Sequence, residues 1–386
     1  MIVVIPAYEP DEKLLGVLKD FTEQTSYSIV VVNDGSSENC RRIFDAVREF
    51  DRVTLLEHEC NKGKGAAMKT AFAYISKRFP SDESVMTVDA DGQHLVSDAV
   101  RVAEKLKEHP DALVLGSRRF TGNVPFKSRA GNAITRTVFR FCTGVRVYDT
   151  QTGLRAFSAS RIPEMLALKG DRYEYEINQL IHCTKNEIRI VEEWIDTVYI
   201  EENKSSHFHA VKDSFRIYKV LLLGTSFVRF IASSFFCFLI DYLLFLLFRS
   251  LFPNLFFGEL IRSSVEASSD SISSIMTAIK PYLTTIIFLS TACARVVSST
   301  CNYLLNRFLV FGARNTSMSF AKYVLLAVIM LCLQAGLTSG AAAIGLNDRV
   351  FYVIIQIILY PVTYLLQRAI VFKRRNQKDI QPGESI

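Results

Sequence analysis

The chain has 386 residues, a formal net charge of +6 and 49% hydrophobic residues, and its mean hydropathy of +0.19 is high for a soluble globular protein. The apolar residues are concentrated after about Leu221, whereas residues 1–205 have the composition of an ordinary charged α/β protein. The basic residues gather near the ends of the apolar stretches, which favours a membrane surface and argues against nucleic acid as the partner.

Short apolar runs alternate with helical patterns through the first half of the chain. Strands are expected at Ile2–Ile5, Ser28–Val32, Val53–Leu56, Val85–Val88 and Ala112–Leu115, and helices at Glu12–Phe21, Glu38–Phe50, Gly65–Lys77 and Val96–Lys107. This alternation predicts a parallel sheet of Rossmann-like α/β type. Residues 116–160 have no clean periodicity, and a further helix and strand are expected at Tyr173–His182 and Ile188–Tyr199. The first strand carries no signal-peptide pattern, so we expect this half to stay in the cytoplasm.

The second half is dominated by apolar segments. Residues His207–Leu223 mix basic and apolar side chains, which is typical of an amphipathic helix at a membrane interface, with a solvated linker helix as the alternative. Four segments of roughly 20 residues follow, each long enough to cross a ~30 Å hydrocarbon core. They lie at about Phe227–Phe248, Leu283–Leu305, Tyr323–Ile344 and Val350–Val371. The positions of the flanking basic residues place both termini in the cytoplasm by the positive-inside rule.

The membrane half contains an internal repeat. The two clearest strings are NYLLNRFLVF at 302–311 and TYLLQRAIVF at 363–372. In the register of this repeat, Asp241, Arg295, Gln334 and Gln356 share one depth, slightly beyond the middle of the bilayer. An unpaired charge at that depth is costly, so we expect Asp241 to pair with Arg295 beside a layer of the two glutamines. Such a layer serves either as a polar site in the bundle or as a contact that fixes helix register.

The strongest local motif is Asp89-Ala90-Asp91-Gly92-Gln93-His94, which directly follows a predicted buried strand. Two carboxylates one residue apart at a strand end, Asp89 and Asp91, can face one hard divalent cation. Mg2+ and Mn2+ prefer such oxygen ligands and keep positions open for phosphate oxygens. A metal held there offsets the charge of a diphosphate and helps a nucleotide to depart. Gln93 is a candidate third ligand, and His94 is expected behind the ligands. The alternative for the two aspartates is a plain surface turn without a metal.

Two further polar clusters are predicted at the same sheet edge, beyond the carboxyl ends of the strands, where such sheets bind ligands. In Pro6-Ala7-Tyr8-Glu9, Tyr8 can stack on a base, and Glu9 or the backbone can bond to the edge of the base. In Asn33-Asp34-Gly35-Ser36, Asp34 can accept a hydrogen bond from a base or a ribose hydroxyl. A simple turn is the alternative for both clusters.

A lysine- and glycine-rich string, Asn61-Lys62-Gly63-Lys64-Gly65, opens a predicted helix. Its glycines allow backbone amides to approach an anion, and Lys62 or Lys64 adds positive charge. The spacing differs from that of a Walker loop, which disfavours ATP hydrolysis.

Taken together, these motifs resemble glycosyltransferase family 2, and within it the dolichol-phosphate mannose synthases and bactoprenol glucosyltransferases. The matching strings span nearly all of residues 1–220: VVIPAYEP, VVNDGSS, NKGKGAAMKTAF, VDADGQH, GSRRF, DTQTGLRAF and SHFHAVKDSFRIY. Residues 225–372 resemble the GtrA-like four-helix membrane family, with NYLLNRFLVF as the clearest string. Asn33 stands where the family often has Asp, which leaves the expected role of Asp34 intact.

The resemblance implies a metal-dependent glycosyltransferase with a GT-A type domain. It implies inverting transfer of a hexose or N-acetylhexosamine from a UDP-linked nucleotide diphosphate sugar to polyprenyl phosphate, with Mg2+ or Mn2+ as cofactor. The implied nucleotide-sugar contacts are Pro6, Ala7, Tyr8, Glu9, Asp34, Lys62, Lys64, Asp89 and Ala90, and the implied metal ligands are Asp89, Asp91 and Gln93. The implied catalytic set is Asp91, Asp149, Gln151, Arg118 and Arg129.

The attacking group implied by the resemblance is a lipid phosphate oxygen, which is already ionised at neutral pH and needs little or no general base. Asp149 is therefore expected to position the sugar or the acceptor. Cations are needed to hold the acceptor phosphate, and Arg118, Arg119 and Arg129 match the basic acceptor region of the family. Solvated loop arginines are the alternative for these three residues.

We expect four parts: a cytoplasmic glycosyltransferase domain (1–204), a juxtamembrane amphipathic helix (205–225), a GtrA-like transmembrane domain of four helices (226–373) and a cytoplasmic tail (374–386). The expected location is a bacterial plasma (inner) membrane, and the product is expected to serve the modification of cell-envelope glycans. The expected partners are the nucleotide sugar, the lipid phosphate and the membrane, a homo-oligomer is left open, and no nucleic acid is expected.

Three other functions are alternatives to this glycosyltransferase prediction. A processive polysaccharide synthase is disfavoured, because such enzymes carry a QxxRW motif before their membrane spans and the single Trp here is Trp194. A GtrA-like half that acts as a lipid-linked-sugar flippase or a membrane scaffold is left open. A GDP-mannose-dependent mannosyltransferase of the dolichol-phosphate type is left open as well.

Overall fold

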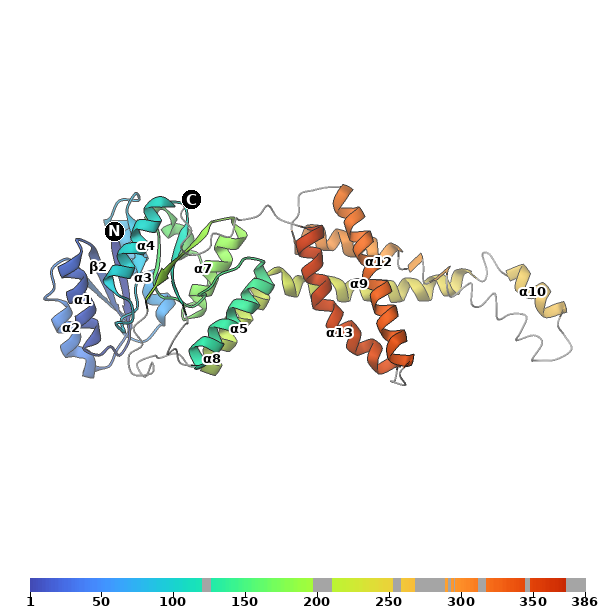
Figure 1. Cartoon of the computed structure of the whole chain (residues 1–386), viewed down its shortest axis with the longest axis horizontal. Helices are drawn as coiled ribbons and strands as arrows, with labels where there is room; N and C mark the ends of the chain where they lie inside the picture. The colour runs from blue at the N-terminus through green and yellow to red at the C-terminus, as the bar shows by residue number, and fades with distance from the viewer. Residues whose placement is uncertain are drawn as a thin grey trace. The chain divides into compact units, whose positions relative to one another are not determined.

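The structure is a computed structural model that describes residues 1–119, 126–196, 210–252, 258–267, 289–290, 293–294, 296–311, 317–343 and 348–372. The chain divides into two compact units, Met1–Thr225 (unit 1) and Ser226–Arg375 (unit 2). Figure 1 shows the mixed α/β character of unit 1 and the helical character of unit 2.

Unit 1 is built on a sheet that, in the described part of the chain, has seven strands in the order β3-β2-β1-β4-β6-β5-β7. The strands are β1 (Ile2–Ala7), β2 (Ser28–Asn33), β3 (Val53–Glu57), β4 (Ser84–Thr87), β5 (Leu113–Arg118), β6 (Arg155–Ser158) and β7 (Ile190–Ile195). The helices are α1 (Lys13–Gln24), α2 (Arg41–Val47), α3 (Lys64–Arg78), α4 (Val96–Glu108), α5 (Phe126–Thr143), α6 (Ile162–Leu166), α7 (Glu174–Lys185) and α8 (Ala210–Gly224), with 3-10 turns η1 (Glu38–Cys40) and η2 (Ala159–Arg161).

The prediction of a purely parallel sheet was wrong, because β6 runs antiparallel to both of its neighbours, β4 and β5. The preceding segment around Asp149 lies against Arg118 at the carboxyl end of β5. The chain therefore enters β6 from the carboxyl edge of the sheet and has to run backwards. The fold is a mixed Rossmann-like sheet, and the stretch 116–160, which had no clear pattern, contains α5 and β6.

Alternating residues of the strands fill a core on each face of the sheet. On β1, Val3 and Ile5 pack in one cluster with Leu14 of α1. Ile2 and Val4 face the other cluster, which includes residues of α3, α7 and α8. This period of two is what a strand buried on both faces requires.

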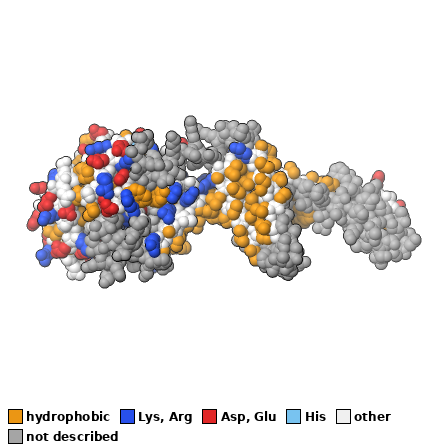
Figure 2. Space-filling view, viewed as in Figure 1, with side chains coloured by type: hydrophobic (Ala, Val, Ile, Leu, Met, Phe, Trp, Pro, Cys, Tyr) orange, Lys and Arg blue, Asp and Glu red, His pale blue; other side chains and the backbone are white. Residues whose placement is uncertain are grey.

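Unit 2 exposes large apolar side chains along its helices. Its described elements are α9 (Ser226–Phe252), α10 (Gly258–Ala267), η5 (Asn306–Val310), α12 (Ser317–Ala343), α13 (Asp348–Leu366) and η6 (Gln367–Val371), with further helical residues at 296–305. On α9, Phe235 and Phe238 are both 62% exposed. Figure 2 shows mixed charge over unit 1 and hydrophobic side chains over the visible face of unit 2. Such apolar surface is stable in lipid rather than in water.

Within the described residues, α9 is the one helix that is long and apolar enough to cross a membrane, and shorter apolar helices cover Ser319–Met330 and Ile358–Val371. Much of the second predicted span lies outside the described residues. The predicted count of four spans and the predicted boundaries at 204, 225 and 373 therefore stay predictions.

The two repeated strings meet inside unit 2. Asn306 and Gln367 hold the same place in the two strings, are buried, and form a hydrogen bond of 3.0 Å between Asn306 Nδ2 and Gln367 Oε1. Each of them begins a π-helical turn. The Phe residues that follow these turns, Phe311 and Phe372, stack with their ring centroids 4.9 Å apart.

The aromatic contacts of the repeat cross between its two halves. The ring of Tyr303 stacks on that of Phe372 at 5.8 Å, and the ring of Tyr364 stacks on that of Phe311 at 5.9 Å. Because equivalent residues exchange equivalent contacts, the two strings pack with approximate two-fold symmetry.

Asp241 of α9 accepts a hydrogen bond of 2.7 Å from the Ser298 hydroxyl. The side chains of Arg295, Gln334 and Gln356 lie outside the described part of the structure. The expected pairing of Asp241 with Arg295 and the glutamine layer therefore stay predictions.

Replacing Asn306 with Leu is expected to destabilise unit 2 by about 1–2 kcal/mol, because several polar contacts worth roughly 0.6 kcal/mol each are lost between membrane helices. Besides its bond to Gln367, the Asn306 amide donates to Asn302 Oδ1 at 3.0 Å, and both of these acceptors would lose their donor. The measurement is unfolding of the full chain in detergent. Thr300→Ala is the matched control, because the Thr300 hydroxyl bonds only within its own helix among the described contacts. An equal effect of both changes would contradict the role of Asn306.

Candidate active site

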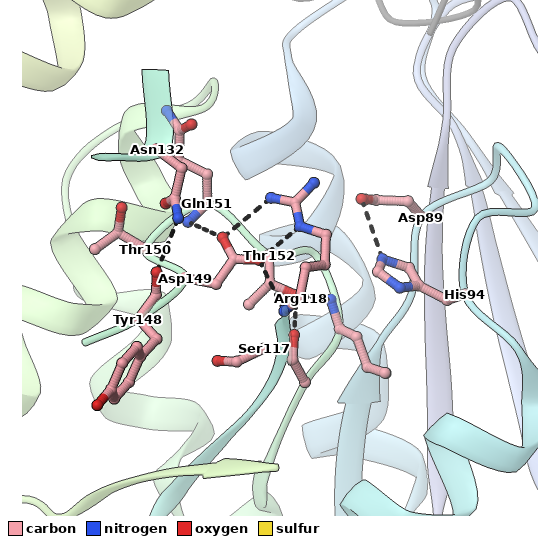
Figure 3. A network of polar contacts seen from close by, with 12 residues as sticks. Asp89, His94, Ser117, Arg118, Asn132, Tyr148, Asp149, Thr150, Gln151 and Thr152 are labelled. Carbon is pink, nitrogen blue, oxygen red and sulfur yellow. Dashed lines mark hydrogen bonds and ion pairs between the residues drawn. The ribbon is translucent and has the colours of Figure 1, made fainter. Parts of the chain in front are cut away.

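Asp89 lies just beyond the carboxyl end of β4 and is held by two cationic or polar side chains. Lys64 Nζ, in the first turn of α3, is 2.6 Å from Asp89 Oδ1 and 2.8 Å from Oε1 of the buried Glu176. His94 Nε2 is 3.6 Å from Asp89 Oδ2 (Figure 3). The strings that carry Lys64 and Asp89 therefore meet at one point of the sheet edge.

The pKa values of the two aspartates in this cluster, Asp89 and Asp91, are shifted in opposite directions. Burial opposes ionisation of Asp89, but the Lys64 ammonium and the hydrogen bond from His94 outweigh it and hold the pKa of Asp89 well below its usual range. Burial and the charge of Asp89 raise the pKa of Asp91. The surroundings of Asp91 therefore disfavour its ionised form, and a cation beside it would favour that form.

The donor set of Asp89 and Asp91 fits a hard divalent cation in chemistry and in charge. Within the described residues no group of three or more His, Cys, Asp or Glu side chains could hold a metal. Mg2+ and Mn2+ accept such a sparse set when phosphate oxygens or water complete their coordination. The Gln93 backbone amide donates to Asp91 Oδ1 at 3.1 Å, and the role of the buried Gln93 side chain as a third ligand stays a prediction.

Gly153 packs directly against Asp89, and the sequence analysis did not single it out. A Cβ atom at Gly153 would overlap both carboxylate oxygens of Asp89. The Gly153 carbonyl also accepts a hydrogen bond of 2.7 Å from Thr87 at the end of β4. The only sequence signal for this contact was the position of Gly153 inside the string DTQTGLRAF.

The lysine–glycine loop is organised by Asp34. The buried Asp34 carboxylate accepts from the backbone amides of Lys62 at 2.9 Å and Gly63 at 2.7 Å, and bonds to His58 Nδ1 at 2.7 Å. Backbone amides of this loop were expected to approach the anion of a ligand. Those of Lys62 and Gly63 instead bond to a carboxylate of the protein itself. Contacts of Asp34, Lys62 and Lys64 with a nucleotide sugar stay predictions.

Glu9, which follows β1, forms hydrogen bonds with Ser37, which follows β2. Its carboxylate accepts from the Ser37 backbone amide at 2.6 Å and from the Ser37 hydroxyl at 2.9 Å. Pro6 and Ala7 close β1, and the Ala7 carbonyl accepts from the Asp34 amide at 2.8 Å. Tyr8 is 38% exposed. Stacking of Tyr8 on a base and the roles of Pro6, Ala7 and Ala90 stay predictions.

Arg118, the last residue of β5, forms a two-pronged ion pair with the fully buried Asp149. Arg118 Nε lies 2.6 Å from Asp149 Oδ2, and Arg118 Nη2 lies 3.0 Å from Oδ1 (Figure 3). The Gln151 backbone amide also donates to Asp149 Oδ1, at 3.2 Å. Because both carboxylate oxygens are engaged, Asp149 is placed to orient Arg118 rather than to remove a proton.

Among the described contacts, the other two arginines of the predicted acceptor region form no hydrogen bond or ion pair with Asp149. The Arg119 guanidinium lies over the ring of Trp194, 5.6 Å from its centroid. Arg129 is exposed on α5. The structure therefore fixes Arg118 at the sheet edge, and the binding of phosphate by Arg119 and Arg129 stays a prediction.

Comparisons with known proteins divide the chain in the same way. Residues 2–160 match the family model described as Glycosyl transferase family 2, and residues 271–372 match the model described as GtrA/DPMS, transmembrane domain. An uncharacterized protein of Methanocaldococcus jannaschii, MJ0544, is 30% identical over 215 residues, which cover 52% of this chain and 90% of that protein. The chain belongs to glycosyltransferase family 2.

Two further relatives have names that describe an activity. The UDP-N-acetylglucosamine–dolichyl-phosphate N-acetylglucosaminyltransferase of Methanococcus voltae is 28% identical over 240 residues, covering 57% of this chain and 94% of the relative. The polyprenol monophosphomannose synthase of Mycolicibacterium smegmatis is 28% identical over 200 residues, covering 50% of this chain and 74% of the relative. The predicted resemblance is confirmed: this family 2 member is a glycosyltransferase with a GtrA-like membrane domain. Two of the three relatives are archaeal, and a bacterial source stays a prediction.

Arg155 is a buried residue of this family 2 domain. It is almost completely buried, and its guanidinium donates to the carbonyls of Thr152 at 2.9 Å and Glu176 at 2.7 Å. It thereby ties the segment that carries Asp149 and Gly153 to α7, which supplies Glu176 to Lys64. This one buried cation therefore contacts the backbone of both segments.

Proposed function

We propose that the chain transfers a hexose or N-acetylhexosamine, with inversion, from a UDP-linked sugar to polyprenyl phosphate. One observation carries the proposal: a single loop supports an anionic centre and a cationic centre at one sheet edge. Gly153 lies against Asp89, and Asp149 of the same loop holds Arg118. Such an edge offers one place for a metal-bound diphosphate and a second place for another phosphate.

The reaction follows from these two centres. A bound Mg2+ or Mn2+ would offset the charge of the donor diphosphate at Asp89 and Asp91. Arg118 holds the acceptor phosphate, whose oxygen forms a bond to the anomeric carbon of the sugar. The bond from that carbon to the diphosphate oxygen breaks, and the nucleoside diphosphate leaves with the electron pair. No proton has to move, which agrees with an Asp149 that is fully engaged by Arg118.

The acceptor class is supported by the surface of α8 and by the relatives. Phe215 and Leu223 of α8 are 69% and 59% exposed, and Lys212 and Lys219 on the same helix are exposed as well. Apolar and basic side chains on one helix suit the interface of an anionic membrane. Two relatives are named for dolichyl phosphate and polyprenol monophosphate chemistry. We propose that the lipid phosphate reaches the site from the cytoplasmic face of the plasma membrane.

The test is mass spectrometry of lipids after incubation of the full chain in nanodiscs with Mg2+ or Mn2+ and a short-chain polyprenyl phosphate. Parallel reactions contain UDP-N-acetylglucosamine, UDP-glucose or GDP-mannose. We expect the lipid mass to rise by one sugar residue with a UDP-linked donor. A product from GDP-mannose alone would favour the mannosyltransferase alternative, and no product with any donor would overturn the proposal.

A further inference from the structure

Glu192 on β7 is a buried carboxyl group that the proposed reaction does not use. It is 3% exposed, although glutamate is seldom buried in proteins without a specific set of partners. Its Oε1 atom accepts from the Ser117 hydroxyl, from the Tyr148 amide at 2.9 Å and from the Asp149 amide at 3.2 Å. These donors come from two segments far apart in the sequence, the end of β5 and the loop before β6.

The residues that Glu192 fixes are the immediate neighbours of the Arg118–Asp149 pair. Ser117 precedes Arg118, and Glu192 bonds to the backbone of Asp149 itself. Asp149 in turn holds Arg118 through both carboxylate oxygens and accepts from the Arg118 amide at 3.3 Å. A displacement of the Asp149 carboxylate would therefore displace the Arg118 guanidinium as well.

We propose that Glu192 is a positioning residue for acceptor binding: it anchors Ser117 and the Tyr148–Asp149 backbone so that Asp149 presents Arg118 to the phosphate of the lipid acceptor. The inference rests on the proposed function, because that function gives Arg118 its ligand. Glu192 does not touch the reacting atoms, so its effect is on the geometry of Arg118 and not on bond making.

The charge state of this group agrees with a positioning role. Burial, together with the charge of Asp149, raises the pKa of Glu192 to about 7, although the bonds from Ser117 and the two amides favour its ionised form. A neutral Glu192 does not repel the Asp149 carboxylate, which pairs with Arg118. A neutral side chain of the same shape should therefore preserve the function, and a truncated one should not.

The test compares Glu192→Gln and Glu192→Ala in the full chain in nanodiscs. The Ala change leaves the Ser117 hydroxyl and two buried amides without their acceptor, and an unpaired buried donor is costly. We expect the Kd of short-chain polyprenyl phosphate to rise at least about tenfold in Glu192→Ala and at most about threefold in Glu192→Gln. The Kd of UDP should stay within about twofold of the wild type in both variants, because UDP does not depend on Arg118.

The matched control is Glu193→Ala, the next residue of β7, whose carboxylate lies 3.9 Å from Arg101 and not at the Asp149 loop. It should leave both Kd values unchanged. If Glu192→Ala does not fold, Glu192→Asp replaces it, since a side chain shorter by one methylene cannot reach all three donors, and it should weaken lipid binding at least about fivefold.

The outcomes separate this inference from the proposed function. A wild type that binds UDP but no polyprenyl phosphate would overturn the proposed function, and this inference with it. A wild type that binds the lipid, with Glu192→Ala binding it equally well, would overturn the positioning role alone. Equal weakening of UDP and lipid binding would show a purely structural role and would also overturn it.

Discussion

Asp91→Asn is expected to lower the rate of sugar transfer at least about 100-fold, because a metal ligand and its charge are lost from the centre that offsets the diphosphate. The same change should not lower the free energy of unfolding of the metal-free protein. Burial and the charge of Asp89 raise the pKa of Asp91 in the folded state. The unfolded state therefore loses this proton at lower pH than the folded state does, and ionised Asp91 opposes folding at neutral pH. A neutral Asn removes this cost.

The measurement is sugar transfer as a function of Mn2+ concentration, together with thermal unfolding with and without Mn2+ and a UDP-linked sugar. We expect the wild type to gain thermal stability on adding metal and donor, and Asp91→Asn to gain little. Asp45→Asn on the exposed face of α2 is the control for loss of one carboxylate, and it should behave as the wild type. Full transfer activity in Asp91→Asn would refute the metal mechanism.

The positions of the first strands in the chain and the place of the motifs after them were predictable from local pattern. The first four strands are short, apolar and separated by helices of clear period, so the polar strings after them had to lie at one sheet edge. Asp89 and Asp91 were found in this way. Strand β6 was missed because it has only the four residues Arg155–Ser158, and it follows the loop 144–154 rather than a helix of the regular alternation.

The partners within the site were not predictable in the same way. Asp34 and the loop at Lys62 and Gly63 were each assigned to an outside ligand, since each string alone has the chemistry to bind one. In the fold they satisfy one another. The same is true of Lys64, which forms ion pairs with Asp89 and Glu176. Local sequence identifies polar groups that need a partner, but the tertiary fold decides which partner they find.

In unit 2, the sequence predicted which positions are equivalent but not which residues contact one another. The repeated strings identified equivalent positions correctly, because a repeat preserves the residues at its own packing surface. What the strings did not reveal is that the equivalents contact one another, with Asn306 bound to Gln367 and Phe311 stacked on Phe372. Asp241 of the predicted polar layer accepts a hydrogen bond from Ser298, which lay outside the repeat argument.

Arg118→Met is expected to have the second large effect, and it acts on stability as well as on acceptor use. Asp149 is fully buried, so removal of Arg118 leaves an uncompensated charge and should destabilise unit 1 by about 3 kcal/mol. Loss of the guanidinium should also lower kcat/KM for polyprenyl phosphate at least about 100-fold, because an apolar side chain cannot replace a cation that holds the phosphate.

The double variant Arg118→Met with Asp149→Asn separates the two effects. Removing both charges should restore most of the lost stability, since the buried charge is then gone, while acceptor use stays as low as in the single variant. Thermal unfolding and transfer at varied polyprenyl phosphate concentration measure the two quantities, and Arg42→Met on the exposed side of α2 controls for the loss of an arginine. If acceptor use recovered together with stability, Arg118 would be a structural cation, and the acceptor phosphate would have to be held by other residues, of which Arg119 and Arg129 are the first candidates.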